Sequence, residues 1–334
     1  MLGTIWLYGG FIIGLIIIIK GGDFFVDAAT WIAHVFKIPT FVIGATIVSM
    51  ATTLPEIVTS IIATVNGNAA YAEGAAKEAE DFYSIATTNA IGSVTANTGM
   101  ILSIGLIFIP MAIRRKDFLL KGLILIASIS TLMIFPALSG GSFPWYAGII
   151  TLALFVVFIW DNLRAAKNAP EASEAESVPT DKKSVITNIS KFIFGTAGIV
   201  LGSVLLVNNG EAIATSWGVS AEIIGVTMIA IGTSLPELIT TITAISKKES
   251  GLSVGNVIGA NIIDTALIVP ICSIISGGRL VVQDNVLMPD LPVCLLTAVI
   301  AIVPTLIFKK FSRWQGVVGL LVYVSYIAYR IVTL

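Results

Sequence analysis

The sequence predicts an all-α membrane protein with ten transmembrane helices, arranged as two inverted five-helix repeats. Three observations support this fold class. The chain of 334 residues is 56% hydrophobic and only 12% charged, whereas soluble domains average about 25% charged residues. Its lysines and arginines fall mostly in the loops on one side of the membrane, and two polar motifs each occur twice along the chain.

The predicted helices are apolar runs of the length that crosses the hydrocarbon core of a bilayer, about 20 residues. The mean hydropathy of the whole chain, +0.96, agrees with this assignment. The first run follows Met1 without a basic leader or a cleavage signature, so we expect a retained helix rather than a signal peptide. The ten runs lie at residues 3–20, 39–65, 85–110, 118–138, 143–163, 190–208, 219–245, 252–276, 288–308 and 314–333.

The distribution of basic residues predicts the orientation in the cell membrane. If the N-terminus lies outside, all but three of the 19 lysines and arginines fall on the cytoplasmic side. The three that remain outside are Lys77, Arg279 and Arg330. The positive-inside rule favours this arrangement, and an even number of spans then places both termini outside.

A polar stretch divides the predicted helices into two sets of five. Residues 164–191 contain most of the charged residues of this part of the chain together with two prolines, which is typical of a flexible linker. We therefore expect a first repeat at 1–163, a cytoplasmic linker at 164–191 and a second repeat at 192–334. Because five is odd, the second set enters the membrane with the opposite orientation.

Two duplicated motifs support the repeats. Residues 44–60 read GATIVSMATTLPEIVTS and residues 225–241 read GVTMIAIGTSLPELITT, with 7 of 17 positions identical. Further along, NAIGSVTANT begins at Asn89 and NVIGANIIDT at Asn256, with 4 of 10 identical. The first repeat carries 14 extra residues near 69–83, which form either a solvated helical loop or an acidic vestibule that concentrates cations.

Each first motif places a glutamate, Glu56 or Glu237, near the middle of an apolar span. A charged side chain at this depth costs at least about 2.5–3.5 kcal/mol, so it needs partners. A proline precedes each glutamate and cannot donate the helical hydrogen bond to the carbonyl four residues back. Irregular backbone at this depth survives only where it lines a cavity, so each repeat can offer carboxylate, carbonyl and hydroxyl oxygens together.

Such an all-oxygen site suits a hard cation, and the charge of two carboxylates matches a divalent ion such as Ca²⁺. Mg²⁺ is less favoured, because it sheds its waters more reluctantly. Proline kinks are also common in membrane helices that bind nothing, but the matched pair of glutamates favours a functional site. Two carboxylates close together in a dry interior resist simultaneous ionisation, so without a divalent ion they hold a proton or a monovalent cation.

The second motifs predict an inward-facing polar stripe on the following helix of each repeat. Residues four apart lie on one face of a helix, as do Asn89, Ser93 and Asn97 and, in the second repeat, Asn256, Ala260 and Asp264. Asn89 and Asn256 could instead join helices through hydrogen bonds. Asp264 is a third intramembrane carboxylate, and we assign it with Asn97 to a central polar site.

These motifs resemble the α-repeats of the sodium/calcium exchangers, the prokaryotic type of the cation/calcium antiporter (CaCA) superfamily. The second copy, GTSLPE from Gly232 and GNVIGANIID from Gly255, carries the resemblance most fully. The resemblance covers essentially the whole membrane part, and it implies ten helices, alternating access and sliding of the first and sixth helices.

The resemblance also implies the roles of site residues. Glu56 and Glu237 are then the calcium carboxylates, and Thr52 and Thr233 supply backbone carbonyls. The implied sodium ligands are Ser49, Thr53, Ser93, Ala230 and Ser234. The chain departs from the family pattern at Ala51, Val94 and Ala260, so sodium coupling and proton coupling both stay open.

We therefore expect a secondary-active antiporter that exchanges Ca²⁺ for Na⁺, with a divalent cation/H⁺ antiporter as the alternative. No hydrolase motif accompanies the carboxylates, and we expect no enzyme activity and no cofactor beyond the transported ions. His34 is the only histidine, which disfavours a histidine-ligated metal. We expect inorganic cations and the lipid bilayer as partners, no nucleic acid, and function as a monomer.

Overall fold

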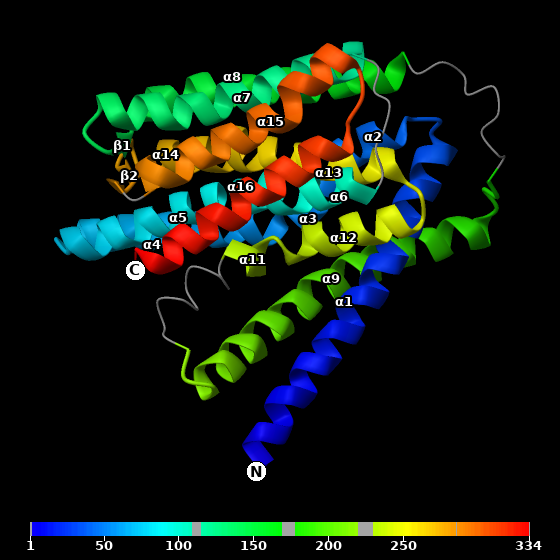
Figure 1. The fold of residues 1–334 in the computed structure, drawn as a ribbon, viewed down its shortest axis with the longest axis horizontal. Coiled ribbons are helices and arrows are strands. Elements are labelled where there is room, and N and C mark those ends of the chain that lie inside the picture. The colour runs from blue at the N-terminus through cyan, green and yellow to red at the C-terminus, as the bar shows by residue number, and fades with distance from the viewer. Residues whose placement is uncertain (1, 109–114, 169–177, 220–229, 285, 334) are drawn as a thin grey trace.

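The computed structural model describes residues 2–108, 115–168, 178–219, 230–284 and 286–333, and this part of the chain is almost entirely helical (Figure 1). The first half comprises α1 (Leu2–Val35), α2 (Thr40–Ile43), η1 (Gly44–Val48), α3 (Ser49–Thr52), α4 (Leu54–Ala72), α5 (Ala76–Ala96), η2 (Asn97–Leu102), α6 (Ser103–Phe108), α7 (Arg115–Leu138), β1 (Ser142–Phe143) and α8 (Trp145–Lys167). The second half comprises α9 (Lys182–Ser216), α11 (Ala230–Thr233), α12 (Leu235–Ser246), α13 (Ser250–Ile263), η4 (Asp264–Ile268), α14 (Val269–Ile275), β2 (Leu280–Val281), η5 (Val286–Asp290), α15 (Leu291–Phe308) and α16 (Arg313–Val332). The η elements are π-helical.

Among the described residues, eight helices are long and apolar enough to cross a membrane. The count is nine if Thr40–Thr52 and Leu54–Ala72, which are bent by 48° at their junction, form one broken span. The predicted span 219–245 falls partly on residues 220–229, outside the described part, and its described helix Leu235–Ser246 has 12 residues. The chain is therefore a multi-pass, all-α membrane protein.

Several helices are longer than the hydropathy pattern predicts, among them α1, α4, α5 and α9. The first apolar run ends at residue 20, but α1 continues to Val35, and α9 begins at Lys182 rather than at residue 190. The N-cap of α9 is Asp181, whose side chain accepts hydrogen bonds from the backbone of Lys183 and Ser184. The hydrogen bonds with Ser184 also lower the pKa of Asp181 below its ordinary value. The predicted run of α1 stopped at Gly21, Gly22 and Asp23, although the helix continues through buried apolar residues such as Phe25 and Val26, whereas the first turns of α9 are polar.

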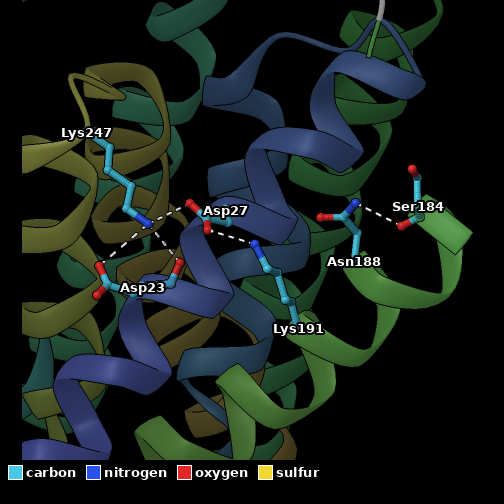
Figure 2. Close-up of polar contacts among 6 residues, drawn as sticks. All are labelled: Asp23, Asp27, Ser184, Asn188, Lys191 and Lys247. Atoms are coloured by element: carbon cyan, nitrogen blue, oxygen red, sulfur yellow. Dashed lines mark hydrogen bonds and ion pairs between the residues drawn. The ribbon is translucent and has the colours of Figure 1, made fainter. Parts of the chain in front are cut away.

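The extension of α1 carries charges that are paired with α9 and with the end of α12 (Figure 2). The Asp27 carboxylate lies 3.0 Å from Lys191 Nζ and 2.6 Å from Lys247 Nζ. Lys247 Nζ also donates to the backbone carbonyl of Asp23 at 2.8 Å. These partly exposed ion pairs connect α1 with α9 and with the α12–α13 turn.

Helices α1 and α9 pack closely through glycines and extend together away from the other helices (Figure 1). A Cβ atom at Gly195 would lie 2.6 Å from the backbone nitrogen of Phe25, and one at Gly202 would lie 2.7 Å from that of Ile18. Small residues permit such approach between membrane helices. Ile12, Ile16 and other large apolar side chains on the outer faces are exposed, as expected for contact with lipid.

Helix α13 of the second half packs against α2, η1 and α3 of the first half through another glycine face. Gly251, Gly255 and Gly259 are four residues apart, so they lie on one side of α13. A Cβ atom at Gly259 would be 2.6 Å from the carbonyl oxygen of Ala45. This close approach brings the polar residues of the two halves together in the interior.

A short antiparallel sheet joins the halves at one end of the molecule. Ser142 of β1 pairs with Val281 of β2, and Phe143 pairs with Leu280. In Figure 1 this sheet lies at the left, at the same end as the C-terminus. The last turn of α8 and the first turn of α9 lie toward the right of this view.

Candidate cation site

The duplicated L-P-E motif forms a helix break with the same backbone geometry in both halves. Thr53 separates α3 from α4 with φ/ψ of −85°/4°, and Ser234 separates α11 from α12 with φ/ψ of −88°/5°. Pro55 and Pro236 occupy the first turn of the following helix, where a missing N–H disrupts no hydrogen bond. The motif therefore begins a new helix in the interior of each half.

Glu56 and Glu237 lie in the first turns of α4 and α12, and both are 0% exposed. A carboxylate at a helix N-terminus is favoured by the helix dipole. Thr53 Oγ1 donates to Glu237 Oε1 at 3.2 Å, so a hydroxyl of the first half touches the carboxylate of the second. Asn89 Nδ2 donates to the backbone carbonyl of Glu56 at 3.3 Å and to Ser60 Oγ at 3.0 Å.

The polar stripe of the second motifs lies beside the glutamates. Asp264 and Asn97 are fully buried, and each is the first residue of a π-helical segment, η4 or η2. Asn97 Nδ2 donates to Ser93 Oγ, and Ser234 Oγ contacts the same Ser93 hydroxyl, both at 3.3 Å. The Glu56 carboxylate interacts electrostatically with those of Glu237 and Asp264.

Thr52 and Asn256 add a second contact between the halves. Thr52 Oγ1 donates to Asn256 Oδ1 at 3.1 Å, and both residues are buried. The stripe residues Asn89 and Asn256 thus bond to the broken-helix motifs, Asn89 within its own half and Asn256 across the halves. In the structure, both residues join helices through hydrogen bonds, which is the alternative considered from the sequence.

Several buried oxygens of this cluster have no hydrogen-bond donor among the described residues. They are both carboxylate oxygens of Glu56, both of Asp264, Glu237 Oε2 and Asn97 Oδ1. Burying an ionised carboxylate without a partner is strongly unfavourable, so these oxygens fit a cation or a proton. The described part contains no group of three or more His, Cys, Asp or Glu side chains arranged to hold a metal, so a cation would also need hydroxyl, amide or carbonyl oxygens.

The family model described as sodium/calcium exchanger protein matches residues 6–163 and 188–332. The chain belongs to the sodium/calcium exchanger family. This is a family of transporters, which agrees with the expectation of a non-enzymatic role. The membership confirms the resemblance that the paired motifs indicated.

Relatives of this exchanger-family chain cover nearly its whole length. It is 33% identical to the uncharacterized membrane protein MJ0091 of Methanocaldococcus jannaschii, over 96% of both chains. It is 30% identical to the putative antiporter CaxA of Alkalimonas amylolytica, also over 96% of both. The sodium/calcium exchanger MaX1 of Methanosarcina acetivorans is 25% identical over 95% of this chain and 96% of that protein.

Solved structures of the sodium-calcium exchanger NCX_Mj have the same fold. The one soaked with 2.5 mM Na⁺ and 10 mM Sr²⁺ superimposes with a TM-score of 0.77 at 29% identity, covering 97% of this chain and 99% of that chain. Another, soaked with 10 mM Na⁺ and no Ca²⁺, gives a TM-score of 0.76 at 30% identity with the same coverage.

The structure brings some of the sodium-ligand candidates together. Thr53, Ser93 and Ser234 belong to the cluster described above. Ser49 is buried, but its hydroxyl donates to the carbonyl of Thr46 in the turn before it, at 3.2 Å. Ala230 is the first residue of α11, and its side chain lies outside the described residues. Thr233 is the last residue of α11, is partly buried and is not without an interaction partner.

Sequence reasoning did not find the π-helical segments or the hydroxyls that contact them. Hydrophobic periodicity does not separate a single π-helical turn from the α-helix around it, so the sequence carried no signal for η2 or η4. Ser60 was also missed as a partner of Asn89. Its place as the last residue of the first duplicated motif was the signal that could have identified it.

Proposed function

We propose that this chain is a secondary-active antiporter that exchanges Ca²⁺ for Na⁺ by alternating access. The observation that carries the proposal is the hydrogen bond of Thr53 to Glu237, which joins the two broken-helix motifs beside buried carboxylate oxygens that have no donor. The names of relatives add support, since MaX1 is a sodium/calcium exchanger and CaxA a putative antiporter.

In the proposed mechanism, Glu56 and Glu237 bind Ca²⁺ together with the backbone carbonyls of Thr52 and Thr233. Sodium ions are held by Ser49, Thr53, Ser93, Ala230 and Ser234, and Asn97 and Asp264 complete the central polar site. The empty site carries uncompensated negative charge in a dry interior, which opposes its movement across the membrane. Either Ca²⁺ or Na⁺ neutralises the carboxylates and permits the rearrangement, so one ion is exchanged for the other.

The proposal includes ten helices in two inverted repeats, at 1–163 and 192–334, joined by a cytoplasmic linker at 164–191. Support comes from the near-identical helix breaks at Thr53 and Ser234 and from π-helical segments that begin at equivalent motif positions. Sliding of α1 and α9 is the proposed movement. These two helices pack closely on each other and extend away from the rest of the molecule (Figure 1).

The test is calcium uptake by the purified protein in sealed liposomes. An outward sodium gradient should drive uptake of ⁴⁵Ca²⁺ against its own gradient, and dissipating the sodium gradient should stop it. A pH gradient of equal size, imposed without sodium, should drive no uptake. Uptake driven by the pH gradient and insensitive to sodium would contradict sodium exchange, and calcium flux that needs no counter-ion would contradict antiport altogether.

A further inference from the structure

Two π-helical segments, η2 and η4, each contact a hydroxyl on a flanking helix that carries none of the duplicated motifs. Thr98 is the second residue of η2, and its Oγ1 lies 2.8 Å from Thr297 Oγ1 on α15. Thr265 is the second residue of η4, and its Oγ1 lies 2.8 Å from Ser128 Oγ on α7. All four residues are at most 2% exposed.

The two contacts match in their further hydrogen bonds. Thr98 Oγ1 donates to the carbonyl of Val94, and Thr265 Oγ1 to that of Asn261, in both cases four residues back and at 2.7 Å. A hydroxyl has one proton, so each threonine that donates back along its helix accepts from the flanking helix. Ser128 and Thr297 have only longer alternatives within their own helices, at 3.0 Å or more, which supports donation across the interface.

The pairs also occupy equivalent places in the two halves. Thr98 and Thr265 are 167 positions apart, the same offset as Asn97 and Asp264. Ser128 and Thr297 are 169 apart, so they correspond to within two positions, on the helix that follows the second motif in each half. A π-helical turn is rare and is found mostly at functional sites, so it needs local support to persist. Here Thr297 and Ser128 bond to Thr98 and Thr265, the residues directly after Asn97 and Asp264.

We propose that Ser128 and Thr297 are positioning residues, which hold the π-helical segments so that Asp264 and Asn97 face the cation site. Ser128 acts on Asp264 through Thr265, and Thr297 acts on Asn97 through Thr98. Neither residue contacts the ion. The inference rests on the proposed function, because it assigns a ligand-positioning role to helices outside the duplicated motifs.

The test uses Ser128→Ala and Thr297→Val, with Ser128→Thr and Thr297→Ser as variants that keep the hydroxyl. Two quantities are measured for each purified protein: the Ca²⁺ concentration that gives half of the calcium-induced rise in melting temperature, and the half-saturating Ca²⁺ for sodium-driven uptake in liposomes. We expect both to rise about three- to tenfold in Ser128→Ala and Thr297→Val, the range for one interhelical hydrogen bond in a membrane protein. The hydroxyl-keeping variants should stay within twofold of wild type.

Ser130→Ala is the matched control, because Ser130 lies on the same helix and its hydroxyl donates only to the carbonyl of Ile126 in its own helix, at 2.7 Å. If the hydroxyl were merely structural, its removal would lower the melting temperature measured without calcium and would leave the half-saturating Ca²⁺ concentrations unchanged. That result, or misfolding of both Ser128→Ala and Thr297→Val, would overturn the positioning role. A wild-type chain that shows neither calcium-induced stabilisation nor exchange would overturn the proposed function and this inference with it.

Discussion

Glu56 and Glu237 have different partners although their motifs match. Glu237 accepts a hydrogen bond from Thr53, whereas neither carboxylate oxygen of Glu56 has a donor among the described residues. The residue equivalent to Thr53 in the second half is Ser234, whose hydroxyl contacts Ser93 instead. Among the described residues, the charge of Glu56 is therefore less compensated by hydrogen bonds than that of Glu237, and under the proposed function Glu56 relies more on the bound cation.

Substitution of either glutamate should abolish divalent transport. Glu56→Gln and Glu237→Gln keep the side-chain shape but remove a charged ligand, so calcium affinity should fall by at least about 100-fold, more than the 10–100-fold typical of outer-shell partners. The measurement is calcium-induced thermal stabilisation together with sodium-driven uptake. Glu211→Gln, at an exposed position on α9, is the control and should behave as wild type. Near-normal uptake by either interior variant would contradict the site assignment.

Ala260 is a position where the two halves differ in chemistry. It is fully buried and stands where the first half has Ser93, a residue of the polar cluster. Ala260→Ser should lower the sodium concentration that half-activates calcium exchange by about two- to tenfold, because it restores one hydroxyl oxygen. The sodium dependence of calcium release from loaded liposomes measures this. An unchanged dependence would remove Ala260 as a determinant of sodium coupling.

At the level of elements, three structural features form the candidate cation site: broken helices, π-helical turns and a glycine face. The breaks at Thr53 and Ser234 place the glutamates at helix N-termini, and the π-helical turns begin at Asn97 and Asp264. The glycines of α13 let that helix approach α2 and η1 closely enough for Asn256 to meet Thr52. None of these features depends on overall hydrophobicity.

Gly259→Ala should destabilise the fold by about 1–3 kcal/mol through overpacking, because its Cβ atom would lie 2.6 Å from the Ala45 carbonyl. Thermal unfolding in detergent should therefore begin at a lower temperature. Gly105→Ala is the control, since a Cβ atom there would lie at an ordinary 3.7 Å from Ser253 Oγ on the same helix α13. Equal melting temperatures for the two variants would argue against the close helix approach.

At the level of the whole molecule, the two halves are also joined outside the polar cluster. The β1–β2 sheet joins a turn of each half, and the ion pairs of Asp27 connect α1 with α9 and with the α12–α13 turn. The predicted orientation assigns the sheet to the outside and the ion pairs to the cytoplasm. The extra residues near 69–83 continue α4 and α5 as a helical hairpin, with Glu73, Glu78 and Glu80 exposed.

This orientation can be tested with introduced cysteines. The native Cys272 and Cys294 are each 1% exposed, so they should react slowly with a membrane-impermeant thiol reagent. Glu73→Cys should be labelled in intact cells, because its side chain is exposed at the predicted outer end, whereas Lys309→Cys should be labelled only after permeabilisation. The reverse pattern would place both termini inside.

The sequence by itself determined that the chain is an all-α membrane protein of the sodium/calcium exchanger family. Apolar length fixes membrane helices, because the bilayer core admits no other kind of segment with this composition. The Pro–Glu motifs also identified the buried glutamates, since a charge and a helix break at this depth are too costly to occur twice by chance. Helix ends were less predictable, because α1 continues past two glycines and carries Asp27, which is paired with Lys191 and Lys247, and because the first turn of α9 is polar and capped by Asp181.

Only the tertiary structure decided which oxygens share the interior. That Thr53 meets Glu237 and that Ser93 meets Ser234 depends on packing between segments far apart in sequence. The hydroxyl contacts of the π-helical segments η2 and η4 with α15 and α7 likewise join residues more than 130 positions apart, which local sequence does not encode. Short-range pattern fixes which residues enter the membrane, whereas their direction is set by the close approach of the two halves.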